Sequence, residues 1–442
     1  MKELIRSVVA DGVAEKALFE RLRRRAGEVD KRVTETVQGI LEDVRLHGDE
    51  AVLRYTRQFD RLDSDAMEVP REAINDALTE ADPAFVSSLL AAMENISRFH
   101  NRQKRESFFT TEENGVLLGQ RVRGLERVGV YVPGGTAAYP SSVLMNVVPA
   151  KIAGVGEIVM VTPPGRDGRA NPDILCAAAV AGVDRVFLVG GAQAAAALAY
   201  GTEQIPKVDK IVGPGNIYVA TAKKLLFGVV DIDMIAGPSE ILVVADETAD
   251  PRWVAADMLS QCEHDVLASS VLLTTSRALA DAVKTELADQ AARLSRRDII
   301  ERSLSEVSAV VVCGTLNEAI ALANELAPEH LELLVADPLT YIGRIDNAGS
   351  VFLGPYAPEP LGDYFAGPNH VLPTGGTARF FSPLSVDSFV KRSSFIYYTE
   401  HALAEAAPDI VRIAEKEGLT AHANAVQVRF TKSDCQGRSR PL

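Results

Sequence analysis

The chain has 442 residues, of which 46 are Lys or Arg and 60 are Asp or Glu, so its formal net charge is −14. At roughly 150 residues per domain this length predicts about three domains. Hydrophobic residues make up 47% of the chain and charged residues 24%, as is typical of a globular protein. The acidic balance argues against nucleic-acid binding, which relies on clustered Lys and Arg.

The first residues of the chain are charged and lack the apolar core of a signal peptide. No apolar stretch of about 18 residues follows, so no membrane-spanning segment is predicted. One basic run lies among helix-forming residues and predicts a solvated helix face: Arg21, Arg23, Arg24 and Arg25. The four cysteines are widely spaced and form no CxxC pair, which predicts a reduced, cytoplasmic protein: Cys176, Cys262, Cys313 and Cys435.

Helical periodicity dominates the chain up to about residue 110. Apolar residues at helical spacing predict a helix over 33–47. A second helix is predicted over 83–101, where Asp82 suits the N-cap and Pro83 the first helical position.

From about residue 128, short β-branched runs alternate with helical stretches, separated by Gly and Pro. The predicted strands are 128–132, 158–161, 186–189, 209–212, 241–245, 270–275, 309–312 and 350–353. The predicted helices are 192–200, 217–226, 251–262, 278–294 and 402–417. This recurrence predicts parallel sheets built from right-handed βαβ units. Two such α/β blocks emerge, and composition leaves open whether they are related.

The first candidate for chemistry is the end of the helix predicted over 251–262. Gln261 and His264 are three residues apart, so both side chains can reach one ion. A neutral imidazole is a common zinc ligand, whereas an amide oxygen is unusual. A capping His beside a surface Gln explains the same spacing.

The second candidate is the pair Glu329 and His330. Pro328 disfavours helical geometry in Ala327, so the pair is predicted at a junction between segments. Adjacent Glu and His can serve two acid–base steps. A salt-bridged pair at a helix end is the alternative.

Two further groups stand out towards the end of the chain. The loop 362–370 is rich in Gly and Pro and carries Asp363, a possible metal ligand, and His370, which turn hydrogen bonding explains equally well. Glu417 and His422 form a polar group that, taken alone, indicates only a polar surface.

The glycine-rich turns leave nucleotide binding open. The chain has no clean G-x-G-x-x-G fingerprint between a first strand and helix. The turn 213–216 opens a predicted helix but lacks the third glycine. Such a turn can still hold a phosphate at a helix N-terminus.

Taken together and in order, eight segments resemble the histidinol dehydrogenase family over nearly the whole chain. These segments are 127–135, 190–193, 212–216, 236–240, 260–265, 327–331, 362–373 and 417–422. Any one of them could be chance, but the ordered set is highly specific.

The resemblance implies a zinc-dependent enzyme that oxidises L-histidinol to L-histidine with two NAD, through a bound aldehyde, in the last steps of histidine biosynthesis. It implies zinc ligation by Gln261, His264, Asp363 and His422. It implies acid–base roles for Glu329 and His330. It implies substrate contacts by Ser239, Gln261, His264, His330, Asp363, Glu417 and His422. It implies NAD contacts by Tyr131, Gln193 and Asn216.

The resemblance also implies an architecture. It predicts an α/β fold of two incomplete Rossmann-like domains with parallel sheets, a helical N-terminal arm and a small C-terminal dimerisation segment. The expected limits are 1–25 for the arm, 26–130 with 240–384 for the metal and catalytic domain, 131–239 for the NAD-binding domain and 385–442 for the C-terminal segment. A homodimer is expected, in which Glu417 and His422 enter the neighbour's active site.

Two alternatives remain at this stage. A related zinc- and NAD-dependent dehydrogenase could act on another polar alcohol, such as a sulfonated diol. Glu417 disfavours that reading, because it would repel a sulfonate and hold a cationic histidinol. A zinc hydrolase that uses Glu329 as its base is the alternative of another class, and it predicts no NAD dependence.

Overall fold

The computed structural model describes residues 4–441, apart from 28–30, 61, 63, 135–137, 166 and 434–438. The side chains of 23–27, 432, 433 and 439–441 are likewise not described. Cys435 and the side chains of Arg23, Arg24 and Arg25 therefore lie outside the described residues. The chain forms two compact units, Met1–Lys104 with Gly124–Val390 and Arg105–Arg123 with Lys391–Leu442.

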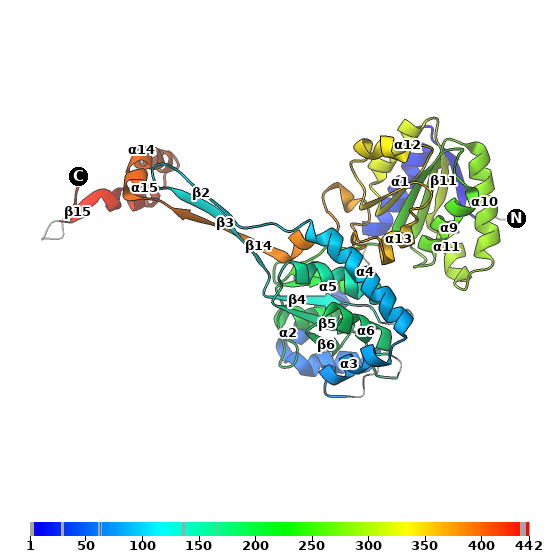
Figure 1. The fold of residues 1–442 in the computed structure, drawn as a ribbon, viewed down its shortest axis with the longest axis horizontal. Coiled ribbons are helices and arrows are strands. Elements are labelled where there is room, and N and C mark those ends of the chain that lie inside the picture. Colours follow the sequence, from blue (N-terminus) through cyan, green and yellow to red (C-terminus); the bar gives the residue numbers. More distant parts are fainter. Residues whose placement is uncertain are drawn as a thin grey trace. The chain divides into compact units, whose positions relative to one another are not determined.

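The larger unit contains a five-stranded parallel sheet in the order β6-β5-β4-β7-β8 (Figure 1). Its strands are β4 (Arg127–Tyr131), β5 (Glu157–Thr162), β6 (Arg185–Leu188), β7 (Lys210–Val212) and β8 (Asp231–Ile232). The helices that connect them are α5 (Pro140–Ile152), α6 (Pro172–Ala181), α7 (Gly191–Tyr200) and α8 (Ile217–Leu226). The predicted strands and helices of this block are thus confirmed to within two residues, and α5 and α6 are additional helices.

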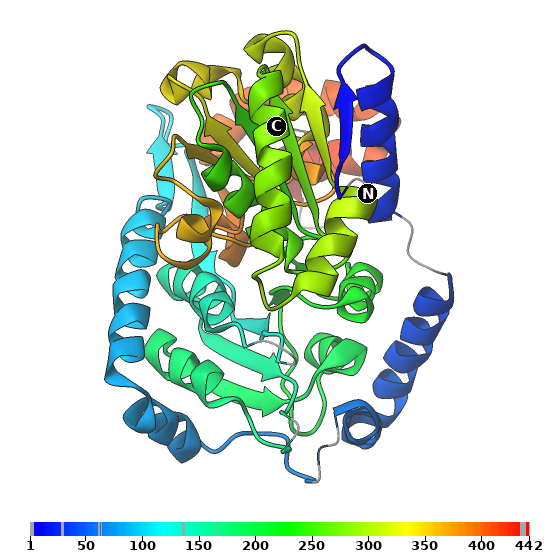
Figure 2. The ribbon, with the colours of Figure 1, turned by 90° about the vertical axis from the view of Figure 1, so that its right-hand side faces the viewer.

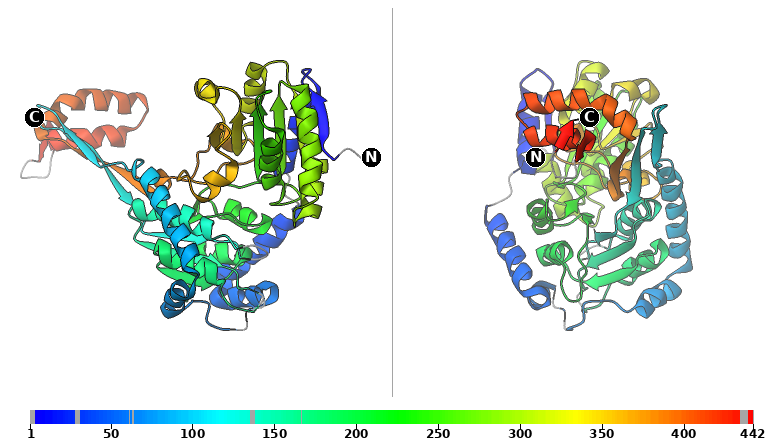
Figure 3. Two further views of the ribbon diagram at one scale, coloured as in Figure 1. Left: turned by 45° about the vertical axis from the view of Figure 1, so that its right-hand side comes forward. Right: turned by 90° about the vertical axis from the view of Figure 1, so that its left-hand side faces the viewer.

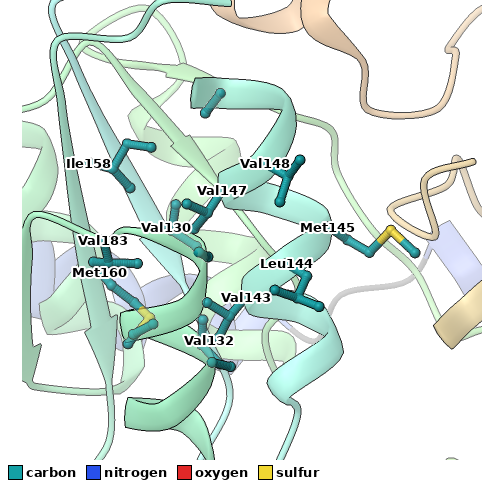
Figure 4. Packing of buried hydrophobic residues seen from close by; sticks show 14 of the residues in the cluster. Val130, Val132, Val143, Leu144, Met145, Val147, Val148, Ile158, Met160 and Val183 are labelled. Atoms are coloured by element: carbon teal, nitrogen blue, oxygen red, sulfur yellow. The ribbon is translucent and has the colours of Figure 1, made fainter. Parts of the chain in front are cut away.

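The buried side chains of this sheet form two hydrophobic clusters, one on each face, because successive side chains of a strand point to opposite faces. Val130 and Met160 pair across β4 and β5 and pack with Val143 and Val147 of α5 (Figure 4). Tyr131 points to the opposite face, where its cluster is formed with α7 and α8. Successive strand side chains point to opposite faces, so one strand serves both clusters.

Three N-terminal helices cover this same sheet: α2 (Lys31–Asp60), α3 (Arg71–Glu80) and α4 (Pro83–Asn101). The chain bends inside α2 at Gly48, where φ is 51°, so the predicted helix 33–47 corresponds to its first half. Asp82 caps α4 by accepting a hydrogen bond from Ala84 N, as predicted.

The predicted grouping of 26–130 with 240–384 stays a prediction, and the structure shows only where the helices of 26–130 pack. Their apolar faces lie in the two clusters of the five-stranded sheet. The sequence shows that each helix has an apolar face but not which sheet that face will cover, because the choice depends on packing between segments far apart in the chain.

The larger unit also contains a six-stranded parallel sheet in the order β1-β11-β10-β9-β12-β13. Its strands are β1 (Arg6–Val9), β9 (Glu240–Ala245), β10 (Ser269–Thr274), β11 (Ala309–Val312), β12 (His330–Leu334) and β13 (Ser350–Leu353). Its helices are α1 (Ala14–Gly27), α9 (Pro251–Cys262), α10 (Arg277–Ala291), α11 (Arg297–Val307), α12 (Leu316–Leu326) and α13 (Glu359–Tyr364).

The predicted N-terminal arm is therefore only partly helical. Its first segment is β1, which pairs in parallel with β11 at the edge of the six-stranded sheet (Figure 2). Two consecutive valines, Val8 and Val9, are too short a run to show a period, which explains why the pattern did not identify a strand.

The two sheets repeat one strand order. When the strands of the five-stranded sheet are numbered in chain order from β4, their order across the sheet is 3-2-1-4-5. The strands of the six-stranded sheet, numbered in chain order from β9, have the same order, and β1 is added at the edge beside β11. The α/β blocks that the sequence separates thus share a topology.

The smaller unit joins two distant segments in a three-stranded sheet of order β14-β3-β2. Its strands are β2 (Phe108–Thr111), β3 (Leu117–Gly124) and β14 (Val390–Tyr397), and two helices, α14 (Glu400–Lys416) and α15 (Thr420–Gln427), pack side by side in it (Figure 3). Residues 105–123 thus extend the predicted C-terminal segment.

The short elements complete the described chain. They are η1 (Pro338–Arg344), η2 (Thr377–Arg379), η3 (Val386–Phe389), η4 (Val428–Phe430), β15 (Thr431–Ser433) and β16 (Ser439–Pro441). Among the described residues, no helix has the length and apolar character needed to cross a membrane.

Candidate active site

Polar side chains gather at the edge of the six-stranded sheet where its strands begin. Glu240 is the first residue of β9 and His330 the first residue of β12. Gln261 lies in the last turn of α9, which returns to this amino edge before β10 begins. Local signals place these residues: Asp250 caps α9, and α12 ends where Ala327 adopts a φ of 53° before Pro328. The predicted junction at Glu329 and His330 is confirmed.

His330 is the centre of this cluster. It is buried, and its Nδ1 lies 3.2 Å from the carbonyl oxygen of Glu240. If Nδ1 donates that hydrogen bond, the neutral imidazole leaves Nε2 as a free acceptor. Nε2 has no hydrogen-bond partner among the described residues. It lies 3.7 Å from Asp363 Oδ1 and 3.8 Å from Glu359 Oε1.

Nearby charges and burial set the protonation of His330 and Glu329. Burial lowers the pKa of His330, but Glu329, Glu359 and Asp363 outweigh it and raise that pKa to about 10. A cation at Asp363 would offset part of this negative charge. Burial raises the pKa of Glu329 to about 7, against the opposing effect of His330. Glu329 Oε2 accepts a hydrogen bond of 2.9 Å from Glu240 N, which fixes the carboxyl beside the imidazole.

A group that suits a metal lies next to His330. One ligand atom each of His264, Glu359 and Asp363 lies within 4.8 Å of the others. Burial lowers the pKa of His264, which favours the neutral imidazole that binds metals. Burial raises the pKa of Asp363, but the interaction with His330 and the charge of His370 outweigh burial and lower that pKa to about 2. The buried Gln261 Oε1 has no hydrogen-bond partner among the described residues.

The structure therefore brings His264 and Asp363 together, and an unpartnered amide oxygen lies one turn before His264. An amide oxygen, a neutral imidazole and an ionised carboxylate form a donor set that fits zinc. Glu359 was missed in the sequence, although its spacing of four residues from Asp363 after Pro358 is a helical signal.

A cavity of about 230 Å³ opens beside this cluster. Its polar lining includes His330, Asp363 and His370, and much of the rest is apolar, such as Phe352 and Leu372. His370 Nδ1 lies 3.0 Å from the carbonyl oxygen of Asp363, so turn hydrogen bonding accounts for this histidine. The size and mixed lining suit a small polar molecule.

The remaining predicted substrate residues lie in two places. Ser239 immediately precedes β9 at the amino edge and accepts a hydrogen bond of 3.0 Å from Ser269 N through its carbonyl oxygen. Glu417 follows α14 and His422 lies in the first turn of α15, both exposed in the smaller unit. Their roles at a metal and substrate site stay predictions.

The predicted NAD contacts lie at the carboxyl edge of the five-stranded sheet, where its strands end. The cluster around His330, by contrast, lies at the amino edge of the six-stranded sheet. Tyr131 ends β4, and its buried hydroxyl accepts a hydrogen bond of 3.1 Å from Gly191 N. Gln193 in α7 is 1% exposed, and neither of its amide atoms has a partner among the described residues. Asn216 caps α8 through hydrogen bonds to Oδ1 from Tyr218 N and Val219 N, which leaves its amide nitrogen available.

This edge contains a topological switch point, because the chain leaves β4 in one direction and β7 in the other. Parallel sheets of this kind bind ligands in the crevice at that point. The turn after β7 approaches β4 so closely that a Cβ on Gly213 would lie 2.1 Å from Tyr131 O. The missing third glycine therefore does not prevent a tight turn here.

Known proteins share this architecture and sequence. The family model described as Histidinol dehydrogenase matches residues 23–430. A histidinol dehydrogenase of Clostridium acetobutylicum is 54% identical over 97% of this chain and 100% of its own length. One of Geobacter sulfurreducens is 56% identical over 94% of this chain and 97% of its own. This chain belongs to the histidinol dehydrogenase family.

The fold agrees with that membership. The crystal structure of histidinol dehydrogenase from Elizabethkingia anophelis matches with a TM-score of 0.91 and 37% identity, covering 97% of this chain and 98% of the other. The predicted resemblance and α/β fold are thus confirmed, and the chain is an oxidoreductase of the histidinol dehydrogenase family. Which residues bind metal, cofactor and substrate stays a prediction.

Proposed function

We propose that this protein oxidises L-histidinol to L-histidine with two NAD, through a bound histidinaldehyde. The observation that carries the proposal is the buried His330, which lines a cavity beside Glu329 and whose Nε2 has no hydrogen-bond partner among the described residues, in a chain of the histidinol dehydrogenase family. The balanced reaction consumes the alcohol, two NAD⁺ and one water. It produces the carboxylate, two NADH and three protons.

Each oxidation removes a hydride from the carbon and a proton from a hydroxyl group on that carbon, so each needs a base. His330 Nε2 would accept the hydroxyl proton in the first oxidation from its neutral form, which a cation held at Asp363 would favour by lowering the pKa of His330 from about 10. The second oxidation starts from the hydrated aldehyde. Glu329, with a pKa of about 7, activates the water for that hydration, and His330 assists again.

Gln261, His264 and Asp363 would hold a zinc ion, with His422 of the neighbouring subunit as the fourth ligand. Zinc supplies Lewis-acid chemistry when bound in such a site. The unpartnered Gln261 Oε1 and the ionised Asp363 support this assignment. Glu359 lies within reach of the same position.

Tyr131, Gln193 and Asn216 would bind NAD at the carboxyl edge of the five-stranded sheet. Gln193 supports this assignment, because a buried amide with both polar atoms unpartnered is costly unless a ligand completes its hydrogen bonds. Ser239 and Glu417 would contact the substrate, and Glu417 would favour its positive charge. A sulfonated diol is disfavoured for the same reason.

The decisive experiment measures NADH formed per L-histidinol before and after chelation. Two NADH per substrate, lost on chelation and restored by zinc, is the expected result. A metal-dependent hydrolysis without NAD would instead support the zinc hydrolase.

A homodimer with shared active sites is part of the proposal. The smaller unit exposes large apolar side chains that a partner would cover: Phe108, Phe109, Phe395, Ile396 and Tyr397. Exposed apolar groups of this size mark interaction surfaces. The cytoplasmic location stays a prediction.

Mixing inactive variants tests the shared sites. Unfolded and refolded mixtures of His330→Asn with His422→Ala should regain about a quarter of the parent activity, because random pairing leaves one intact site in each heterodimer. Mixtures of His330→Asn with Glu329→Gln are the matched control and should regain none. Equal results from both mixtures would contradict shared sites.

A further inference from the structure

A partly buried carboxylate at the carboxyl edge of the five-stranded sheet has no role in the mechanism above. Asp60 is the last residue of α2, and the sequence pattern does not single it out. Its Oδ2 atom is buried and has no hydrogen-bond partner among the described residues. Burial raises the pKa of Asp60 to about 6, and the N–H of Gly190 opposes that rise. A buried carboxylate oxygen without a partner is costly, so the Oδ2 atom calls for one.

Asp60 lies among the groups already assigned to NAD. Burial raises the pKa of Tyr131 to about 12, and the charge of Asp60 adds to that rise, so the two groups are neighbours. The Tyr131 oxygen accepts from Gly191 N, which leaves its own hydrogen free to be donated. A Cβ on Gly191 would lie 2.5 Å from Gln193 Oε1. A carboxylate, a hydroxyl and an amide from three elements therefore surround the turn that begins α7.

The position matches a requirement of dinucleotide binding. Dinucleotide folds use a carboxylate beyond the second strand of the sheet to bind the ribose hydroxyls. The second strand here is β5, and Pro163 and Pro164 follow it in place of a carboxylate. The next acidic residue, Asp167, is exposed, and its Oδ1 already accepts a hydrogen bond from Arg169 N.

Asp60 lies beside the end of β5 although it comes from a helix that precedes the sheet. A Cβ on Gly190 would approach both Pro163 Cβ, at 2.7 Å, and Asp60 Oδ2, at 3.2 Å. Glycine at this position keeps the space between them open. The helix α2 thus brings to this edge the acceptor that the β5 turn lacks.

We propose that Asp60 accepts hydrogen bonds from the vicinal hydroxyls of an NAD ribose and selects NAD against NADP. This inference rests on the NAD dependence proposed above. A carboxylate can accept from both hydroxyls, whereas a 2′-phosphate would place a second negative group against a buried carboxylate. Asp60 is therefore a specificity-determining residue of the cofactor site.

Equilibrium titration of the full chain, without histidinol, tests the inference. Three proteins are compared by calorimetry: the parent, Asp60→Asn and Asp167→Asn. Each is titrated with NAD, 2′-deoxy-NAD and NADP. Hydrogen bonds to a charged group predict that Asp60→Asn weakens NAD binding by about 10- to 100-fold. Asp167→Asn, the matched control on the β5 turn, should stay within about twofold of the parent.

The ligand series separates recognition from a general disturbance. The parent should prefer NAD over 2′-deoxy-NAD and over NADP, and Asp60→Asn should lose most of both preferences. An unchanged preference for NAD in Asp60→Asn overturns the inference, as does an effect confined to Asp167→Asn. A parent that binds no NAD overturns the proposed function instead. Asp60→Ser provides a second substitution, and the same loss of discrimination is expected from it.

Discussion

The two sheets of the larger unit share one strand order, yet their polar sites lie at opposite edges. In the five-stranded sheet the candidate cofactor residues surround the switch point at the carboxyl ends of β4 and β7. In the six-stranded sheet the candidate catalytic residues lie at the amino ends of β9 and β12. Topology therefore does not decide where chemistry takes place, and the side chains at each edge do.

The equivalent switch point of the six-stranded sheet is closed by a side chain. Asp246, directly after β9, is buried and accepts hydrogen bonds from Thr248 N at 3.0 Å and Ala336 N at 2.9 Å. A carboxylate in that crevice satisfies the backbone groups that a ligand would otherwise meet. In the five-stranded sheet no carboxylate directly follows β4, whose turn carries glycines. In the turn after β7, the Gly213 N–H is bonded to Asp233, which comes after β8.

The largest expected effect comes from His330→Asn at the amino edge. Loss of the base should lower the rate of histidinol oxidation by about 10²- to 10⁴-fold. NAD affinity should be unchanged, because the cofactor residues lie on the other sheet. Steady-state NADH formation and NAD titration measure the two quantities. His401→Asn, on an exposed histidine of α14, is the control, and a rate loss shared by both variants would contradict the role of His330.

Lys223→Met should disturb the carboxyl edge of the five-stranded sheet instead. Lys223 and Asp233 form an ion pair with side chains 4% and 1% exposed. Together they hold the turn after β7, since Lys223 Nζ donates to Gly213 O at 3.0 Å and Gly213 N donates to Asp233 Oδ2 at 2.8 Å. Removing one partner of a buried pair costs about 3–5 kcal/mol of unfolding free energy.

Urea unfolding measures that cost, and NAD titration should show weaker binding by Lys223→Met. The half-exposed pair of Lys151 with Asp184 provides the control. Lys151→Met should cost about 0–1 kcal/mol and leave NAD affinity unchanged. Equal losses from the two substitutions would show that the buried pair has no special role at the turn.

Asp246→Ala tests whether the switch point of the six-stranded sheet has only a structural role or also binds the cofactor. The substitution leaves the N–H groups of Thr248 and Ala336 without their acceptors, which costs about 1–3 kcal/mol of unfolding free energy. NAD affinity should stay that of the parent. Weaker NAD binding by a folded Asp246→Ala protein would instead indicate that both crevices bind the cofactor.

The smallest expected effect is the pH dependence of Asp60→Asn stability without NAD. An acid whose pKa rises from 3.8 to about 6 on folding destabilises the folded state once the unfolded chain ionises. That destabilisation grows as pH rises from 3.8 to about 6 and is constant above 6. Asp60→Asn removes it, so the variant should be stabilised at pH 8 and much less so at pH 4.5.

Partial exposure of Asp60 reduces the expected gain to about 1 kcal/mol at pH 8. Thermal midpoints of parent and variant at the two pH values measure it. A gain that is equal at both values would contradict a raised pKa at this site.

The sequence predicted the elements better than their partners. The caps and prolines of α4 and α9 gave the bounds of both helices, because those signals act within one turn. Metal and acid–base residues were named from local motifs and from the family resemblance. Glu359 was missed although its helical spacing from Asp363 was a usable signal, and Asp60 was missed because it has no motif of its own and its neighbours are distant in the chain.

The sequence by itself determined the helical and strand periods, the α/β class, the family and the residue types available for chemistry. Only the tertiary structure decided that α2 covers the five-stranded sheet, that β1 extends the six-stranded sheet, and that Asp60 reaches the end of β5. Only it showed that one topology carries its two candidate sites at opposite edges. Local patterns fix elements through contacts within a few residues, whereas sites form where buried polar groups of distant segments meet without other partners.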